Sequence, residues 1–309
     1  MHRLSDKRMD RRQWLVATGA AGVAAASGSA IAQITAAPGR RIVSVGGALT
    51  ETVYVLGAQD DLVGVDTTSL YPEVARALPS VGYARSLSAE GVLSLRPTLV
   101  VASEDAGPPV VLRQLEAARV PLVVLNGDHR FEGVLSRTQR LAELIGRADA
   151  GRIVAASMRQ EWQTTRERIT RLAPAGQAVP RVLFVLSHAM GQVRVAGRDT
   201  SADAMIRYAG GVNVFGGKDT DSGFTGYKPL TPEAAIAAAP DVILGTDQGL
   251  TAAGGIDGLL RLPGLAQTPA GRHRRVVSLE ALLLLGFGPR LPQATLALAE
   301  ALHAKGAGA

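Results

Sequence analysis

The feature that most constrains this chain is an alternation of short apolar runs with longer helical stretches. Between the runs lie segments with helical apolar spacing, such as 48–56 and 110–118. Short buried strands separated by helices are typical of βαβ units around a parallel sheet. The sequence therefore predicts an α/β fold whose first strands lie at residues 41–45, 62–65, 99–102 and 122–125.

This alternation is interrupted in the middle of the chain. Residues 131–145 and 148–172 are rich in charge and have helical spacing, and a strand pattern resumes at Arg181–Leu186. A helix of about 25 residues is ~37 Å long at 1.5 Å per residue, enough to connect two lobes. We predict α/β lobes over 40–147 and 176–309, joined by a stiff linking helix within 148–175. An ordinary surface helix inside one α/β domain is the alternative.

An internal match supports two related lobes. Residues 87–103 align without gaps to residues 230–246. Each segment has a hydroxyl residue suited to cap a helix, a glutamate in the first turn, a proline that ends the helix and a buried strand. A Gly-Tyr pair precedes each segment, with a spacing that differs by one residue. The usual sequence signals for the start and end of a helix explain the capping residues and the prolines. They do not explain the repeated Gly-Tyr pair.

The N-terminus has the pattern of an export signal. A basic segment that ends in Arg11-Arg12 precedes an uncharged run over 14–26, and Ala30-Ile31-Ala32 fits a cleavage site. The apolar run is shorter than the ~20 residues of a membrane-spanning helix. We therefore predict a signal peptide over 1–32, exported by either the general or the twin-arginine route. A membrane-anchored N-terminus is the poorer alternative, because the run is rich in alanine and glycine.

Composition excludes several classes of protein. The net charge of +6 falls to +3 without the first 32 residues, which hold five basic and two acidic residues. This is weak for a nucleic-acid-binding surface, and nucleic acid is not an expected partner. The sequence has no cysteine, which predicts a freely diffusing periplasmic protein rather than a lipoprotein. Its five histidines lack zinc-site spacing, and no nucleophile elbow or phosphate loop is present, so we expect no enzyme.

Four segments closely resemble the periplasmic haem-binding proteins of haem ABC transporters. The most specific element is Gly82-Tyr-Ala-Arg85, which directly precedes Leu87-Ser-Ala-Glu90. The likeness covers about residues 40 to 303, and it implies a haem-binding cleft between two lobes. Other members of the wider superfamily bind cobalamin or ferric siderophores with the same two-lobe fold. The four segments are 81–97, 186–205, 224–230 and 284–290.

The resemblance implies that Tyr83 is the axial ligand of ferric haem iron. Tyrosine is a known class of haem ligand, and a phenolate oxygen suits Fe(III). Because a free phenol has a pKa of about 10, the phenolate needs the iron and a nearby cation to stabilise it. Arg85 is the local candidate, and its guanidinium could instead bind a haem propionate.

The second lobe is expected to supply further haem contacts. The repeat places Tyr227 and Lys228 at the opposite rim, where hydrogen bonding or charge pairing with propionates is expected. His188 follows a predicted strand and is expected to point toward the cleft. Some family members use a second-lobe histidine to coordinate iron or to bind a second haem, but here a polar rim histidine is the preferred interpretation.

Glu90 and Glu233 correspond to the glutamates that dock the superfamily onto its permease. Each lies seven residues before a proline, at the same offset in both lobes. A first-turn glutamate also favours a helix electrostatically by ~0.3–1 kcal/mol, which explains each residue singly but not the matched offset. The resemblance thus implies an inner-membrane ABC permease as partner of a protein that is otherwise expected to be a monomer.

Three other functions stay open on the sequence. The nearest is the same scaffold carrying cobalamin or a ferric siderophore, although Tyr83 followed by Arg85 weighs against it. The second is an exported hydrolase using Ser187 or His188, for which no motif is present. The third is a haem-storage or chelatase-like protein without a transport partner. The number of bound haems and the presence of a sixth iron ligand are also open.

Overall fold

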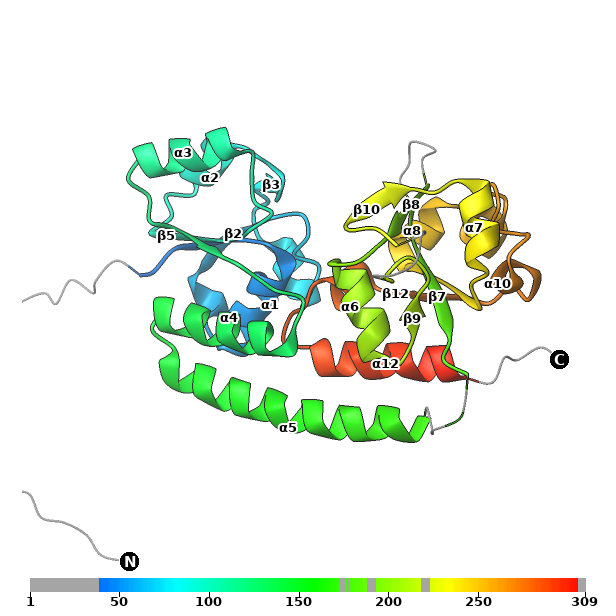
Figure 1. The fold of residues 1–309 in the computed structure, drawn as a ribbon. Coiled ribbons are helices and arrows are strands. Elements are labelled where there is room, and N and C mark those ends of the chain that lie inside the picture. Colours follow the sequence, from blue (N-terminus) through cyan, green and yellow to red (C-terminus); the bar gives the residue numbers. More distant parts are fainter. Residues whose placement is uncertain (1–38, 173–175, 177, 188–192, 218–222, 305–309) are drawn as a thin grey trace, which may run out of the picture. The chain divides into compact units, whose positions relative to one another are not determined.

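The computed structural model describes residues 39–172, 176, 178–187, 193–217 and 223–304. The elements form two α/β groups, which we call the N-terminal lobe (β1 to α4) and the C-terminal lobe (β7 to α12), with the long helix α5 between them in sequence (Figure 1). This is the α/β architecture expected from the sequence. None of the described helices is long and apolar enough to cross a membrane.

A four-stranded parallel sheet forms the centre of the N-terminal lobe. The order of its strands is β2-β1-β5-β6, so the two strands nearest the N-terminus lie on one side of β5. All four lie where the apolar runs predict them. Their bounds are Ile42–Val45 for β1, Leu62–Val65 for β2, Leu99–Ser103 for β5 and Leu122–Leu125 for β6.

Successive side chains of β1 enter two different cores. Ile42 joins a cluster with Leu49 and Leu141, whereas Val43 and Val45 join a second cluster that includes Leu115. This alternation is what a strand buried on both faces produces. The surrounding helices are α1 (Gly47–Val55), α2 (Ala89–Ser94), α3 (Pro109–Ala117) and α4 (Phe131–Leu144), with short 3-10 helices at Gln59–Asp61 and Glu73–Ala77.

Helix α5 spans Ala148–Leu172, the range in which a linking helix is predicted. It packs against α4 of the N-terminal lobe and α12 (Leu291–His303) of the C-terminal lobe. Figure 1 shows these helices side by side. The buried residues of α5 recur every three or four positions, so one stripe of the helix is covered and the charged remainder faces solvent. They are Gly151, Ala155, Met158, Trp162, Thr165 and Ile169.

The sheet of the C-terminal lobe mixes parallel and antiparallel strands. Its order is β10-β8-β7-β11-β12, and β9 pairs with β7. Strands β11 and β12 run parallel to β7, whereas the β7–β8 and β8–β10 pairs are antiparallel. The strand bounds are Arg181–Ser187 for β7, Val193–Ala196 for β8, Val212–Asn213 for β9, Tyr227–Pro229 for β10, Val242–Thr246 for β11 and Val276–Leu279 for β12.

Helices cover this second sheet as well. Phe184 and Leu244 belong to a core with residues of α5, α6 and α12, and Leu183 and Ile243 belong to a separate core. The remaining helices are α6 (Ser201–Tyr208), α7 (Pro232–Ala238), α8 (Asp247–Ala252), α9 (Gly255–Leu260), α10 (Pro269–Arg272) and α11 (Ala281–Leu285).

The two segments of the internal match adopt the same local structure. The Ser88 hydroxyl accepts a hydrogen bond from the Gly91 amide, and the Thr231 hydroxyl accepts one from the Ala234 amide, each at 3.2 Å. These caps begin α2 and α7, and each helix leads into a buried strand, β5 or β11. The hydroxyl caps predicted from the repeat are therefore formed in both lobes.

A buried ion pair joins the lobes at the start of α12. The Glu51 carboxylate in α1 accepts hydrogen bonds from the Arg290 amide at 3.1 Å and from Arg290 Nη2 at 2.9 Å. The Glu51 side chain is only 2% exposed. Burial raises the pKa of Glu51 above its ordinary value, although the hydrogen bonds and charge of Arg290 oppose that rise. The Arg290 guanidinium also lies 3.6 Å from the centre of the Tyr71 ring.

Removing one member of this pair is expected to destabilise the protein strongly. Glu51→Ala should lower the free energy of unfolding by roughly 3 kcal/mol, because it leaves the partly buried Arg290 charge without its carboxylate. Urea unfolding measures the change. Glu143→Ala is the matched control, since the Arg140–Glu143 pair is more than half exposed and should contribute less than about 1 kcal/mol. Equal effects of the two substitutions would contradict the assignment.

Candidate functional site

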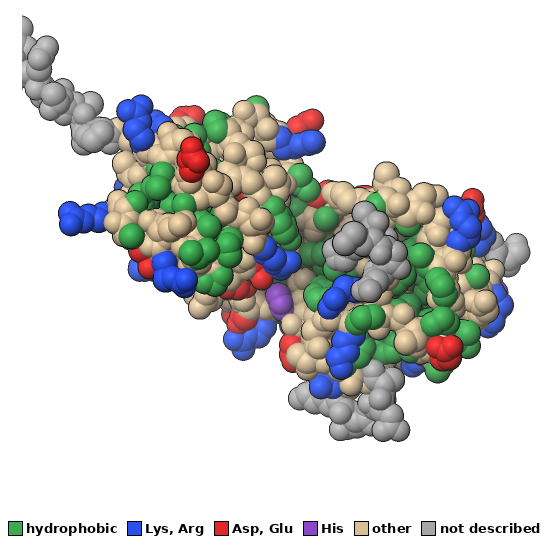
Figure 2. Space-filling view, turned by 90° about the horizontal axis from the view of Figure 1, so that it is seen from above, with side chains coloured by type: hydrophobic (Ala, Val, Ile, Leu, Met, Phe, Trp, Pro, Cys, Tyr) green, Lys and Arg blue, Asp and Glu red, His purple; other side chains and the backbone are tan. Residues whose placement is uncertain are grey.

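Charged residues gather where β5 and β6 end. Glu104 and Asp105 follow β5, and Asp128 and His129 follow shortly after β6. In parallel α/β sheets, ligands bind beyond the carboxyl ends of the strands. Figure 2 shows a hollow in the surface between two bulkier parts of the molecule. Hydrophobic side chains, a histidine and charged side chains of both signs lie along this hollow.

Tyr83 is presented to solvent by a short hairpin near this edge. The hairpin pairs β3 (Gly82–Tyr83) with β4 (Ser86–Leu87). Gly82 has a φ of +94°, a backbone conformation that glycine adopts at little cost. The turn leaves Tyr83 44% exposed while its neighbour Ala84 is buried.

Arg85 links Tyr83 to Asp105. Its Nη1 donates to the Tyr83 hydroxyl at 3.3 Å, and its Nη2 lies 2.6 Å from Asp105 Oδ2. Burial opposes the charged form of Arg85, but the hydrogen bond and charge of Asp105, together with Tyr83, raise its pKa above the ordinary value. The guanidinium predicted to stabilise the phenolate therefore contacts the phenol oxygen in this structure.

Tyr227 is the first residue of β10 in the C-terminal lobe. Its ring is half-buried, and its centre lies 6.4 Å from the centre of the Phe184 ring. Burial raises the pKa of Tyr227, whereas the nearby polar groups of Ser201, Thr200 and Ala202 and the positive charge of Arg85 oppose that rise. Arg85 thus exerts its charge on Tyr227 across the lobes while it contacts Tyr83.

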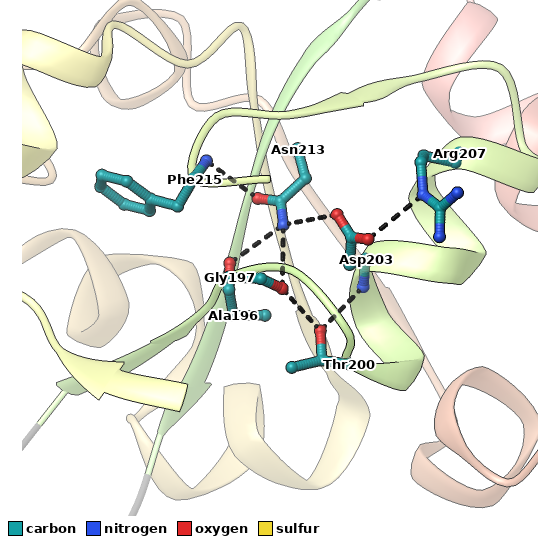
Figure 3. A network of polar contacts seen from close by, with 7 residues as sticks. All are labelled: Ala196, Gly197, Thr200, Asp203, Arg207, Asn213 and Phe215. Atoms are coloured by element: carbon teal, nitrogen blue, oxygen red, sulfur yellow. Dashed lines mark hydrogen bonds and ion pairs between the residues drawn. The ribbon is translucent and has the colours of Figure 1, made fainter. Parts of the chain in front are cut away.

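A buried polar network holds the turn between β8 and α6 (Figure 3). The Asn213 side-chain amide donates to the Ala196 carbonyl at 3.0 Å and to Asp203 Oδ1 at 3.0 Å, and Asn213 Oδ1 accepts from the Phe215 amide at 3.2 Å. The Thr200 hydroxyl accepts from the Asp203 amide at 3.1 Å and so caps α6. Because buried polar groups are costly without partners, this network fixes the turn between β8 and α6.

The Gly-Tyr pair of the second lobe repeats the backbone of the first. Gly226 has a φ of +77°, like the positive φ of Gly82. The Gly226 carbonyl accepts a hydrogen bond from the Gly197 amide at 2.8 Å. The two Gly-Tyr pairs found by the internal match therefore share a glycine conformation as well as a sequence.

Lys228 follows Tyr227 and is exposed. Its ammonium nitrogen lies 5.0 Å from the centre of the Phe224 ring, a cation–π contact. His188, the other rim residue predicted from the sequence, lies outside the described residues. Ser187, which the hydrolase alternative names together with His188, is the last residue of β7.

Glu90 and Glu233 are both exposed, each as the second residue of its helix, α2 or α7. Their equivalent positions follow from the shared cap-and-helix structure of the two lobes.

His129 and Asp105 lie beyond the ends of β6 and β5, and the motif analysis did not single them out as candidate site residues. The His129 ring packs against Phe287 of the C-terminal lobe, with ring centres 5.3 Å apart. Burial lowers the pKa of His129, Arg137 adds to this, and the acidic residues Glu104, Asp128 and Asp105 oppose it. Their position in the sequence could have indicated them, because both residues follow predicted strands. In parallel α/β sheets, ligands bind beyond the carboxyl ends of the strands.

A groove between α4 and α5 contains none of the predicted residues. Phe131 and Trp162, whose rings stack 4.7 Å apart, form part of its lining together with charged residues of both helices. This groove is lined by helix faces rather than by strand ends. The region beyond the ends of β5 and β6, near the hairpin that carries Tyr83, is therefore the stronger candidate site.

Comparison with known proteins identifies the family. A family model described as periplasmic binding protein matches residues 42–282. The chain belongs to the periplasmic binding protein family. The matched range includes both Gly-Tyr pairs and both exposed glutamates.

Solved structures of this family include haem-binding members. The periplasmic haem-binding protein RhuT from Roseiflexus sp. RS-1, in its apo form, is 43% identical with a TM-score of 0.81, covering 86% of this chain and 98% of that one. BhuT, solved with two haems, is 48% identical with a TM-score of 0.79, covering 85% and 98%. A haem-binding protein from Pseudomonas aeruginosa is 38% identical with a TM-score of 0.76, covering 87% and 95%.

More distant members of the family carry other names. An uncharacterized ABC transporter substrate-binding lipoprotein of Bacillus subtilis, YvrC, is 26% identical over 85% of this chain and 80% of its own length. A vitamin B12-binding protein of Vibrio campbellii is 24% identical over 69% of this chain and 73% of its own length. The three haem-binding structures named above are thus more similar in sequence to this chain than these two relatives are.

His129 is expected to make stability depend on pH. Its folded-state pKa lies below the ordinary value of 6.5, so the unfolded chain binds a proton more readily than the folded protein. The free energy of unfolding should therefore decrease as the pH falls below about 6.5 and through the lower folded-state pKa of His129. NMR titration of the His129 ring and urea unfolding between pH 5 and 8, about the range where histidine titrates, measure this. An unchanged pH profile in His129→Gln would contradict it.

Proposed function

We propose that this protein binds haem in the periplasm and delivers it to an inner-membrane ABC transporter. Haem is the transported cargo and not a catalytic cofactor. The observation that carries the proposal is the exposed Tyr83 hydroxyl held against Arg85, in a chain up to 48% identical to periplasmic haem-binding proteins. The same relatives are binding proteins, which supports a binding role rather than an enzymatic one.

Tyr83 supplies the iron ligand in this proposal. When its oxygen binds Fe(III), the phenol proton leaves to solvent, and the phenolate charge is shared between the iron and the Arg85 guanidinium. Because Arg85 already donates to that oxygen at 3.3 Å, little rearrangement is needed. A hydrogen bond to a charged group is stronger than one to a neutral group, so this contact strengthens when the ligand forms.

The opposite rim supplies contacts for the haem carboxylates. Tyr227 and Lys228 are the first two residues of β10, and Lys228 is exposed. A phenol hydroxyl and an ammonium group both donate hydrogen bonds to carboxylates. We propose that these residues, with Arg85, orient the propionates, and that His188 is a polar residue of the same rim.

Loss of the Tyr83 hydroxyl should change both the spectrum and the affinity. In Tyr83→Phe, the bands of bound ferric haem should shift and hemin affinity should fall at least about tenfold, or 1.4 kcal/mol. Absorption titration of the apoprotein with hemin measures both. Tyr54→Phe in α1 is the control, because that tyrosine packs against the core beside Leu49 and Leu141 and should leave both unchanged. An unaltered spectrum in Tyr83→Phe would refute the ligand assignment.

The runner-up function is cobalamin or ferric-siderophore binding on the same scaffold. It has support from the vitamin B12-binding relative, at 24% identity. Titrating one apoprotein preparation with hemin, cobalamin and a ferric siderophore decides between the cargoes. We expect saturable binding of hemin alone, and the stoichiometry of that titration distinguishes one haem from two.

Delivery requires a docking surface, and we propose Glu90 and Glu233 for it. Both carboxylates are exposed at the same position of their helices, α2 and α7. In this proposal each one binds a basic pocket on the permease. A haem-storage protein without a transport partner would not need a glutamate at the same position of both lobes. The protein is proposed to act as a monomer without nucleic acid.

Charge reversal at both glutamates should abolish docking. We expect Glu90→Arg with Glu233→Arg to weaken capture of the cognate permease at least about tenfold while hemin affinity stays unchanged, because like charges repel across an interface. Glu167→Arg, an exposed reversal on α5, is the control and should retain capture. Full capture by the double variant would refute the docking role.

Export is the last part of the proposal. Periplasmic relatives support it, and we propose a signal peptide over residues 1–32, which lie outside the described residues. The B. subtilis relative is a lipoprotein, whereas this sequence has no cysteine to carry a lipid. N-terminal sequencing of the mature protein tests the cleavage site after Ala32.

A further inference from the structure

The Arg85 guanidinium has two partners on different nitrogen atoms. Nη1 donates to the Tyr83 hydroxyl at 3.3 Å, and Nη2 lies 2.6 Å from Asp105 Oδ2. The guanidinium is a rigid planar fork, so fixing one nitrogen determines where the other points. The shorter contact, to an ionised carboxylate, is the stronger of the two. Asp105 therefore determines the orientation in which Arg85 meets Tyr83.

The backbone ties Asp105 to the hairpin that carries Tyr83. The Gly107 amide donates to the Ala84 carbonyl at 2.9 Å, and the Leu87 amide donates to the Gly107 carbonyl at 2.8 Å. Ala84 and Ala106, the residues beside Tyr83 and Asp105, are both buried. The three functional side chains thus project from two segments that are fixed to each other.

Arg85 would be poorly held without its carboxylate. The Arg85 and Asp105 side chains are 58% and 59% exposed, so packing does not confine the guanidinium. The contact with the neutral phenol is long for a hydrogen bond and cannot by itself offset the rotamer entropy of an arginine side chain.

We propose that Asp105 is a positioning residue for the haem ligand: it holds Arg85 so that the guanidinium donates to the Tyr83 oxygen and stabilises the iron-bound phenolate. This inference rests on the proposed function and extends it to a residue that does not contact the iron. Asp105 acts only through Arg85, and its contribution disappears when Arg85 is absent.

Hemin titration of Asp105→Asn in the full chain tests the proposal. We expect affinity to fall roughly tenfold, the lower end of what outer partners of metal ligands contribute, with a shift in the bands of the ferric complex. Asp105→Glu should restore both. The carboxylate is exposed, so thermal unfolding should be nearly unchanged. Asp257→Asn is the matched control, because Asp257 pairs with Arg274 at the same 2.6 Å on the exposed surface of the other lobe.

A double-mutant cycle separates positioning from a general charge effect. In an Arg85→Gln background, Asp105→Asn should change neither affinity nor spectrum. Unchanged or tighter hemin binding by Asp105→Asn, while Tyr83→Phe still alters the spectrum, would overturn the positioning role and leave the proposed function intact. An unaltered spectrum in Tyr83→Phe would instead refute the ligand assignment and this inference with it.

Discussion

The arrangement of the two lobes depends on the buried ion pair between Glu51 and Arg290. Burial disfavours the Glu51 charge, and Arg290 offsets that cost only while the two side chains remain in contact. A movement that separated the lobes at this point would leave a buried carboxylate without its cation, which is strongly unfavourable. Packing of α5 against both α4 and α12 resists the same movement. Both features favour modest closure around a ligand over a wide hinge motion.

This restraint matters because the candidate site draws on both lobes. Tyr83, Arg85 and Asp105 belong to the N-terminal lobe, whereas Tyr227 begins β10 in the C-terminal lobe. The Arg85 charge acts on tyrosines of both. A planar ligand with an iron centre and carboxylate edges suits such a site, since a phenol oxygen and cationic donors are presented together. Lobes fixed by a buried pair present these groups before any ligand arrives.

Much of the fold was predictable from local patterns. The runs at 41–45, 62–65, 99–102 and 122–125 form strands, and the hydroxyl caps at Ser88 and Thr231 begin helices. The strands β8, β9 and β10 were not predicted. Strands β9 and β10 have only two and three residues, and β8 is not a continuous apolar run because Arg194 interrupts it. The helix at 148–172 was predicted as a linker, but its packing on α12 depends on residues more than a hundred positions away.

By itself, the sequence determined the α/β class, the repeated Gly-Tyr and glutamate positions, and the likeness that points to haem. These features are local, since a cap, a turn glycine or a motif needs only a few neighbouring residues. Only the tertiary structure decided that Asp105 pairs with Arg85, that His129 packs on Phe287 and that Glu51 pairs with Arg290. These partners lie 20, 158 and 239 positions apart, and they meet because folding brings strand ends and lobes together, which no local pattern encodes.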